Sequence, residues 1–432
     1  MCASRPTGAT PPILSQLWRS KLVNETASYG GLNVIRALIP VLLVPVLTRY
    51  LTPADYGMIV LFEFSRNLGV QIFGLGTVNA IRRRYFDPER VEFARYLSSA
   101  ILANVFGFAV MLLVLAVLVA LGWGLPATAM WALAPLIVGQ VLLFLFLGVL
   151  QLHHRSIAFG IVLIVNTLTN FGLSVLLVVH FDWGWYGRIW AIVAAAVGSA
   201  VLAAILALRH VRPVLPQRRW VRDALDYGLP MIPNGLSFKL SAFADRVLVA
   251  ALISVSVAGI YAAAYQFAMV ITMAAQSLVY AWTPWLFERL KRQDARADRA
   301  VVKATYAGCA ALGLGAAAAI FVVHALLPWI VGKSFHGATV FTPWLLAGAA
   351  FRSMGLMVTG IILFAERTGI LALIALASLV VNALLLVVLV KWIGPVGAAQ
   401  ASCVASLVAL IVTWRVAARL RPLPWRLRPA SH

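Results

Sequence analysis

The chain has 432 residues, of which 62% are hydrophobic and only 11% are charged, and its mean hydropathy is +0.93. Soluble domains carry about 25% charged residues, so this composition cannot build a water-facing surface and indicates a protein whose main solvent is lipid. The formal net charge of +21 does not indicate nucleic-acid binding, because membrane proteins gather Lys and Arg in their cytoplasmic loops.

Long apolar segments recur along the chain in two sets of six. An apolar helix of about 20 residues crosses the hydrocarbon core of a bilayer, so the predicted fold class is all-α, with about twelve transmembrane helices. We predict an N-lobe of helices 1–6 at 1–208, a basic cytoplasmic linker at 209–227, a C-lobe of helices 7–12 at 228–416 and a basic cytoplasmic tail at 417–432. The expected spans are 29–51, 56–79, 97–122, 128–151, 156–180, 187–208, 228–253, 258–286, 304–330, 339–364, 369–391 and 394–416.

Basic residues concentrate in the two tails and in alternate loops. The positive-inside rule then places both termini in the cytoplasm. The loops on the outer side are very short, so no outer domain exists to hold a catalytic centre, and we do not expect an enzyme. Basic residues assigned to the outer loops are Arg49, Arg188, Lys333 and Lys391.

The two halves look related. Helices 5 and 6 contain Asn170 followed by Gly184-x-x-Gly187, and helices 11 and 12 contain Asn382 followed by Gly394-x-x-Gly397. Six helices in each half give both halves the same orientation, so the pseudo-symmetry axis lies along the membrane normal. Such a repeat predicts two lobes that rock about a central site. Chance similarity between apolar segments is the alternative.

Several basic residues lie inside predicted spans. Each costs roughly 2.5–3.5 kcal/mol at the centre of a membrane helix, so a membrane protein keeps them only where they face water, a partner charge or a ligand. Guanidinium groups bind phosphate groups in bidentate geometry. We therefore predict a central cavity between helices 1, 2 and 7 whose basic side chains bind a pyrophosphate. They are Arg36, Arg66, Lys239, Arg246 and Arg352.

Two acidic residues accompany them, Glu63 and Asp245, and we expect gating or ion coupling from these. Glu63 is also spaced to pair with Arg66 on its own helix, and Arg246 could snorkel outward. Other polar side chains on the same helices could contact a sugar, although packing between helices is the competing role. These are Asn33, Tyr265, Gln276 and Tyr280.

Two segments carry a resemblance to a known family. YGGLNVIRALIPVLLVPVLTRYLTPADYG, at 29–57, resembles the first helix and loop of Wzx-type polysaccharide and O-antigen flippases. VVNALLLVVLVKWIGPVGAAQASCVASLV, at 380–408, resembles their helix 11 to 12 hairpin. These flippases belong to the multidrug/oligosaccharidyl-lipid/polysaccharide exporter superfamily.

The resemblance implies two lobes around a V-shaped, cation-lined cavity and an undecaprenyl-pyrophosphate-linked glycan as cargo. Relatives that flip the peptidoglycan precursor use arginines on helices 1, 2 and the second lobe. Arg36 and Arg66 match that pattern by helix, whereas Lys239 and Arg246 match it only approximately. Those relatives carry two further C-terminal helices, which makes that precursor the less expected cargo here.

The sequence therefore predicts a flippase in a bacterial cytoplasmic membrane that works by alternating access, as a monomer and without a cofactor. Membrane lipids and a polysaccharide polymerase complex are the expected partners. The main alternative is a cation-coupled multidrug exporter, which would need buried carboxylates, and the second is a membrane glycan polymerase or ligase. Cys2, Cys309 and Cys403 are too scattered for a metal site or a disulfide framework.

Overall fold

The computed structural model describes residues 42–86, 92–122, 124–212, 214–292 and 294–425. No β-strand occurs among these residues, so the predicted all-α class is confirmed. Residues 42–50 are helical. The following helices are α2 (Pro53–Phe73), α3 (Thr77–Tyr85), α4 (Phe93–Ala120), α5 (Ala127–Leu152), α6 (Ser156–Val175), the π-helix η1 (Leu176–His180), α7 (Gly184–Leu208), α8 (Arg218–Gly228), α9 (Met231–Leu252), α10 (Val255–Arg292), α11 (Ala295–Ile330), the 3₁₀ helix η2 (Lys333–Phe335), α12 (Ala338–Phe364), α13 (Thr368–Ile393) and α14 (Val396–Leu420).

Most of these helices can cross a membrane. Within the described residues, nine helices are long and apolar enough, and the bent pair α2 and α3 makes a tenth. α9 is 22 residues long but carries Lys239, Asp245 and Arg246, and this charge sets it apart from the apolar spans. The predicted first span, 29–51, lies mostly outside the described residues.

The second predicted span, 56–79, is broken rather than continuous. α2 ends at Phe73, the backbone of Leu75 and Gly76 is left-handed (φ 51° and 64°), and α3 leaves at an angle of 48°. A Cβ on Gly76 would lie 2.6 Å from the carbonyl oxygen of Gly228, the last residue of α8 before the turn into α9. The break therefore lets the chain near α3 approach the α8–α9 turn closely.

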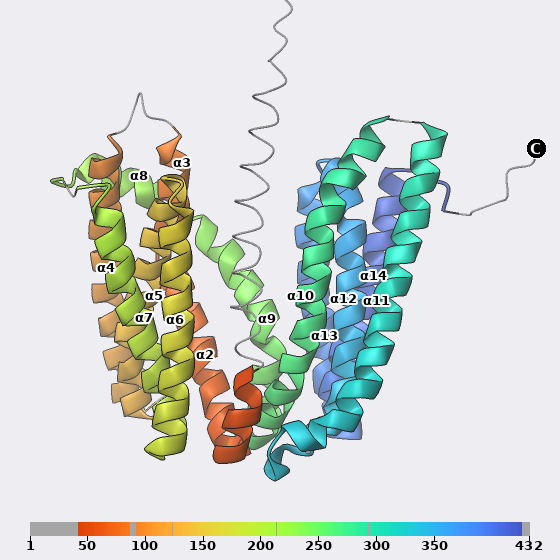
Figure 1. Cartoon of the computed structure of the whole chain (residues 1–432), viewed down its shortest axis with the longest axis horizontal. Helices are drawn as coiled ribbons and strands as arrows, with labels where there is room; N and C mark the ends of the chain where they lie inside the picture. Colours follow the sequence, from red (N-terminus) through yellow and green to blue (C-terminus); the bar gives the residue numbers. More distant parts are fainter. Residues whose placement is uncertain (1–41, 87–91, 123, 213, 293, 426–432) are drawn as a thin grey trace, which may run out of the picture.

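The helices form two groups (Figure 1). The N-terminal bundle comprises α2–α7, and the C-terminal bundle comprises α9–α14. They lie together where α2 and α10 begin, which we call the converging end, and they spread apart toward α3 and α8, which we call the diverging end (Figure 1). The bounds predicted for the two lobes stay a prediction.

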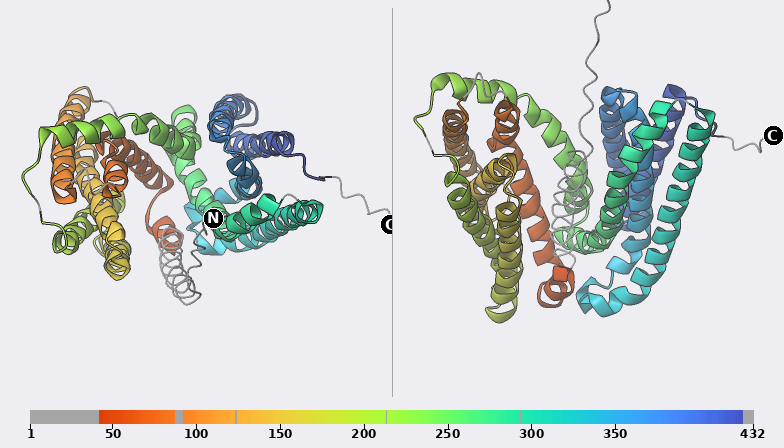
Figure 2. Two further views of the ribbon diagram at one scale, coloured as in Figure 1. Left: turned by 90° about the horizontal axis from the view of Figure 1, so that it is seen from above. Right: turned by 45° about the horizontal axis from the view of Figure 1, so that its top comes forward.

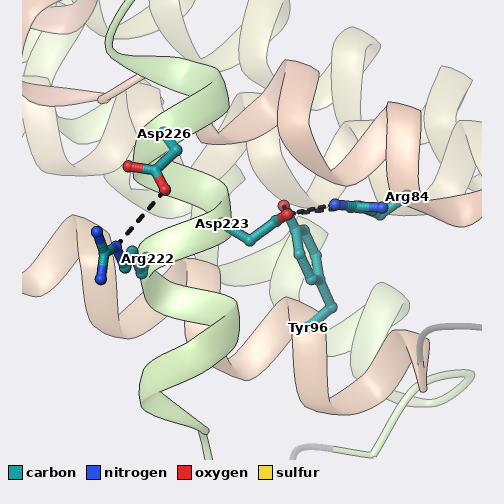
Figure 3. A network of polar contacts seen from close by, with 5 residues as sticks. All are labelled: Arg84, Tyr96, Arg222, Asp223 and Asp226. Carbon is teal, nitrogen blue, oxygen red and sulfur yellow. Dashed lines mark hydrogen bonds and ion pairs between the residues drawn. The ribbon is translucent and has the colours of Figure 1, made fainter.

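α8 lies across the ends of the N-terminal helices rather than alongside them (Figure 2). Asp223 accepts hydrogen bonds from Arg84 Nε at 3.0 Å and from the Tyr96 hydroxyl at 2.9 Å (Figure 3). The buried Trp220 meets Tyr96 edge to face, with 5.8 Å between ring centroids. The predicted linker thus contains a helix that is anchored to the N-terminal bundle.

The charge of Asp223 belongs to this anchor. Burial alone would raise the pKa of its carboxyl group, but hydrogen bonds from Arg84 and Tyr96 and the charges of Arg84 and Arg83 more than offset it. The pKa of Asp223 therefore lies below its ordinary value. On the outer face of α8, the exposed Arg222 pairs with Asp226 at 3.8 Å (Figure 3).

At the converging end, α2 and α10 cross through two glycines. A Cβ on Gly57 would lie 2.0 Å from the carbonyl oxygen of Val255, and a Cβ on Gly259 would lie 2.0 Å from that of Pro53. Any larger side chain at either position would push the two helices apart. The glycine of each helix thus packs against the first turn of the other helix.

The two crossing helices also begin alike. Thr52 precedes α2, and its Oγ1 accepts a hydrogen bond from the Asp55 N–H at 3.2 Å. Ser254 precedes α10, and its Oγ accepts one from the Val257 N–H at 3.2 Å. Such hydroxyl caps satisfy backbone N–H groups that a helix start leaves unpaired. In both helices the glycine of the crossing follows the cap by five residues, which is a second repeat between the halves.

Apolar side chains surround this crossing. Tyr56 of α2 meets Phe335 of η2 edge to face at 5.6 Å, and Tyr261 of α10 meets Phe341 of α12 at 5.7 Å. All four belong to a single buried cluster that includes residues from both bundles. We call this contact between the start of α2, the start of α10 and the loop between α11 and α12 the seal. It closes the space between the bundles at the converging end.

Candidate functional site

The structure describes most, but not all, of the predicted site. Asn33 and Arg36 lie outside the described residues, and so does the side chain of Tyr280. The remaining predicted residues lie on the helices that line the contact between the bundles or on their neighbours. They are Glu63 and Arg66 on α2, Lys239, Asp245 and Arg246 on α9, Tyr265 and Gln276 on α10, and Arg352 on α12.

Two basic residues meet where α2 packs against α9. Lys239 Nζ donates a hydrogen bond to Asn67 Oδ1 at 3.3 Å, which links the two bundles. Arg66, the neighbour of Asn67, is close enough to repel the Lys239 ammonium. Neither cation forms an ion pair within the described part of the chain, and both are only half-buried. The contact thus holds two positive charges from opposite bundles without a carboxylate between them.

Three further residues meet in the C-terminal bundle. The Arg246 guanidinium lies over the ring of Tyr265, with Cζ 3.9 Å from the ring centroid. Arg352 Nη1 donates a hydrogen bond to the Tyr265 hydroxyl at 3.1 Å. Tyr265 therefore holds two guanidinium groups, which come from α9 and α12. Arg246 covers one face of the ring, so a sugar stacked on that face would have to displace Arg246.

Asp245 is buried beside these residues, but it binds neutral partners. The Asn382 amide and the Tyr261 hydroxyl both donate to its carboxyl group, the latter at 3.2 Å. Among the described residues no basic side chain pairs with Asp245. The charges of Asp245 and Arg352 also attract each other, although no direct ion pair joins the two side chains.

The N-terminal bundle holds a buried ionic group that the sequence analysis missed. Arg188 was assigned to an outer loop, but it lies inside α7 and is only 7% exposed. Its Nη1 donates to Asn170 Oδ1 and Ser174 Oγ, both at 2.5 Å, and its Nη2 lies 4.0 Å from Glu63 Oε1. Glu63 therefore pairs with another helix rather than with Arg66.

The two asparagines of the predicted repeat have matching roles. Asn170 binds the buried Arg188 in the N-terminal bundle, and Asn382 binds the buried Asp245 in the C-terminal bundle. Gln276 is half-buried on α10 and forms no hydrogen bond with another described residue. The site thus contains a buried cation network in one bundle, a buried carboxylate in the other, and basic side chains between them.

Comparison with known proteins identifies the family. A family described as "Polysaccharide biosynthesis protein" matches residues 22–289, which is well over half of the chain. The chain belongs to this family. It is a polysaccharide flippase family of the multidrug/oligosaccharidyl-lipid/polysaccharide exporter superfamily, so the resemblance found in the sequence is confirmed. Family and fold are those of membrane transporters.

Two relatives come from Haemophilus influenzae. The product "Lsg locus putative protein 1" is 23% identical over 327 residues, which cover 74% of this chain and 79% of that protein. An "Uncharacterized membrane protein" is 24% identical over 276 residues, which cover 63% of this chain and 66% of that protein, just under two thirds of its length.

Solved structures with the same fold are transporters of the same superfamily. An inward-facing multidrug resistance MATE transporter gives a TM-score of 0.68 at 14% identity, over 91% of this chain and 96% of that one. An outward-facing MATE structure gives 0.57 at 15% identity, over 92% and 94%. A superfamily transporter from Pyrococcus furiosus gives 0.58 at 14% identity, also over 92% and 94%. These likenesses establish the fold.

Proposed function

We propose that the protein flips a lipid-pyrophosphate-linked oligosaccharide, the repeat unit of a polysaccharide or O-antigen, across a bacterial cytoplasmic membrane by alternating access. The observation that carries this proposal is the set of basic side chains that both bundles bring together, none of which forms a direct ion pair with a described carboxylate. Arg66 and Lys239 meet across the contact between the bundles, and Arg246 and Arg352 lie on the C-terminal side. A pyrophosphate would supply the negative charge that these side chains lack.

The shape of the molecule supports cytoplasmic loading of the cargo. The diverging end carries the basic helix α8, and the positive-inside rule assigns such loops to the cytoplasm, as it does both termini. In that orientation the diverging end of the bundles (Figure 1) would face the cytoplasm and the converging end would face the outside. The higher TM-score with the inward-facing transporter, 0.68 against 0.57, fits this reading.

The mechanism follows from differential binding. In the inward-open form the pyrophosphate would bind Arg66 and Lys239, with the glycan between the bundles and the lipid tail in the membrane. Breaking the seal would then open the site outward, and the anion must bind the two forms with different affinity to drive the exchange. Glu63 and Asp245 are our candidates for gating or ion coupling, because Asp245 is buried without a direct ion pair among the described residues and Glu63 lies 4.0 Å from Arg188.

The proposal is tested by replacing Arg66 with alanine. A charge-assisted hydrogen bond contributes about 1.5–3 kcal/mol, so Arg66→Ala should weaken pyrophosphate binding by roughly 10- to 150-fold and abolish flipping in cells that lack the native gene. The assay measures surface polysaccharide and the leaflet in which lipid-linked glycan accumulates. Arg415→Ala is the matched control, since Arg415 is exposed on α14 and has no partner among the described residues.

Accumulation in the cytoplasmic leaflet with Arg66→Ala, and normal surface glycan with Arg415→Ala, would support the proposal. Normal surface glycan with Arg66→Ala, at wild-type protein levels in the membrane, would refute the assigned role of the basic site. Accumulation in the outer leaflet would instead place the defect in polymerisation or ligation.

The second candidate is a cation-coupled multidrug exporter, which the fold favours because the similar MATE structures are multidrug resistance transporters. The Pyrococcus furiosus transporter is described as having a binding pocket of reverse polarity, which suggests a different function. In this chain, the positive charges of Arg66 and Lys239 would repel cationic drugs, which argues against the exporter. Drug resistance on overexpression, with unchanged surface glycan on deletion, would favour the exporter.

A further inference from the structure

A second basic site lies at the converging end, on the opposite side of the seal from the proposed cargo site. A cavity of about 580 Å³ is lined there by Thr48 and Arg49 of the helical segment 42–50 and by the end of α11 with the loop that follows it. The lining residues thus come from both halves of the chain. Three of them, Arg49, Lys333 and His336, carry basic side chains.

The lining of this cavity contains no carboxylate. Arg49 Nη2 donates to the Trp329 carbonyl oxygen at 3.2 Å, and His336 Nε2 lies 3.1 Å from the Pro328 carbonyl oxygen. Lys333 is exposed and has no ion-pair partner among the described residues. Positive charges that share a cavity repel one another, and a bound anion removes that repulsion.

The position of these charges is unusual for the chain. The predicted outer loops contain few basic residues. One of those assigned to them, Arg188, is instead buried within α7. Two of the remaining three, Arg49 and Lys333, line the same cavity, and Lys391 at the end of α13 does not. Two of the few basic residues in these outer loops therefore lie together at the converging end, where the two halves of the chain touch.

The cavity is complete only while the seal is closed. The Gly332 N–H donates to Thr48 Oγ1 at 3.1 Å, and a Cβ on Gly332 would lie 2.0 Å from the Thr48 carbonyl oxygen. This backbone contact holds Arg49 next to Lys333. When the bundles separate at the converging end, the contact breaks and the basic side chains move apart.

We propose that this cavity binds a phosphoryl anion and that its occupancy favours the form in which the seal is closed. The anion bridges Arg49 on one side and Lys333 and His336 on the other, so it binds the closed form more tightly than the open form. Such a difference in affinity is what allows a ligand to shift a conformational equilibrium. The phosphoryl group can come from a lipid headgroup or from free phosphate. The site does not depend on the identity of the cargo.

The experiment uses the full chain, with its three cysteines replaced by serine and spin labels introduced through Arg218→Cys on α8 and Arg299→Cys on α11. Both positions are exposed at the diverging end. Inorganic phosphate is titrated at constant ionic strength against chloride, and the distance distribution between the labels is measured in detergent. Phosphate should increase the population with the longer distance, because a closed seal keeps the diverging ends apart.

Arg49→Gln and Lys333→Gln should each raise the phosphate concentration at half-effect about tenfold, since each removes a charged hydrogen-bond donor. Lys391→Gln is the matched control: it removes an exposed positive charge that does not line the cavity, and it should leave the titration unchanged. Equal titrations in all four proteins, or an equal shift with Lys391→Gln, would overturn the proposal.

The source of the anion is identified by repeating the distance measurement in lipid nanodiscs, in a buffer that contains no free phosphate. If phosphatidylglycerol lengthens the distance relative to phosphatidylcholine, and Arg49→Gln abolishes the effect, a lipid headgroup occupies the site. If only free phosphate acts, the ligand is soluble. Neither readout requires cargo, so failure of the flippase proposal and failure of this one are separable.

Discussion

Replacing Gly259 with alanine tests whether the glycine crossing holds the seal closed. The added methyl carbon would lie 2.0 Å from the Pro53 carbonyl oxygen, whereas ordinary contacts begin at 3.4 Å. The difference is 1.4 Å, and the obstacle is backbone rather than a flexible side-chain tip, so α2 and α10 must separate. Overpacking of this kind costs about 1–3 kcal/mol. The open form lacks the contact and does not incur this cost.

The closed form of Gly259→Ala should therefore become roughly 5- to 150-fold less populated relative to the open form, since about 1.4 kcal/mol corresponds to a factor of ten. The labels at positions 218 and 299 report this change as a shift toward shorter distances at the diverging end. Gly355→Ala is the matched control, because a Cβ there, in another membrane helix, would meet nothing within 4 Å.

An unchanged distance distribution for Gly259→Ala would refute the reasoning, because the helices would then have absorbed the methyl group without parting. An equal shift for Gly355→Ala would attribute the effect to alanine substitution in general rather than to the crossing.

Three other predictions concern the anchored linker, the buried arginine and the paired guanidiniums. Because the pKa of Asp223 is lowered in the folded protein, its carboxylate stabilises the α8 contact above the ordinary carboxyl pKa, and this stabilisation is lost as the pH falls through the lowered value. Hydrogen exchange of 218–228 should accelerate in acid, and Asp223→Asn should be fast already at neutral pH. Arg188→Met should cost about 1–3 kcal/mol for each buried polar partner left unpaired and lower the Tm in detergent. Tyr265→Phe keeps the ring beneath Arg246 but loses the bond to Arg352, so it should reduce flipping less than Tyr265→Leu does.

Each of these has a contradicting result. A pH-independent exchange rate in 218–228 would show that the Asp223 charge does not anchor α8. An unchanged Tm for Arg188→Met would mean that its partners find new donors. Equal flipping by Tyr265→Phe and Tyr265→Leu would show that the contact between the ring and Arg246 does not contribute to transport.

Hydropathy predicted the fold class well because lipid imposes one rule on every span. An apolar stretch of membrane length must be helical, since its backbone polar groups have no other partners in lipid. The same scan missed α8, because Trp220 and Ala224 give it a narrow apolar face among charged residues. It also treated Gly74 to Gly76 as part of a span, although two glycines around Leu75 are a signal for a chain break.

The site was harder to predict, because a side chain's surroundings depend on helix rotation and packing. Arg188 follows a short turn, which suggested a loop, yet α7 had already begun at Gly184 and carries it inward toward Glu63. The pairing of Glu63 with α7 could not be read from spacing on α2. Tyr265 illustrates the reverse case, since its stripe on α10 was predicted, but the two arginines that hold it come from α9 and α12.

The crossing of α2 and α10 has the form of a homodimer interface within one chain. In a two-fold dimer each subunit offers the same patch to the other, and here a capped helix start and its glycine serve as that patch twice, with Gly57 against Val255 and Gly259 against Pro53. A patch that is already matched inside the molecule is not available to a second copy. Association between two molecules would therefore have to use a different surface. The covalent chain joins the two patches, so each molecule forms this contact once, with itself.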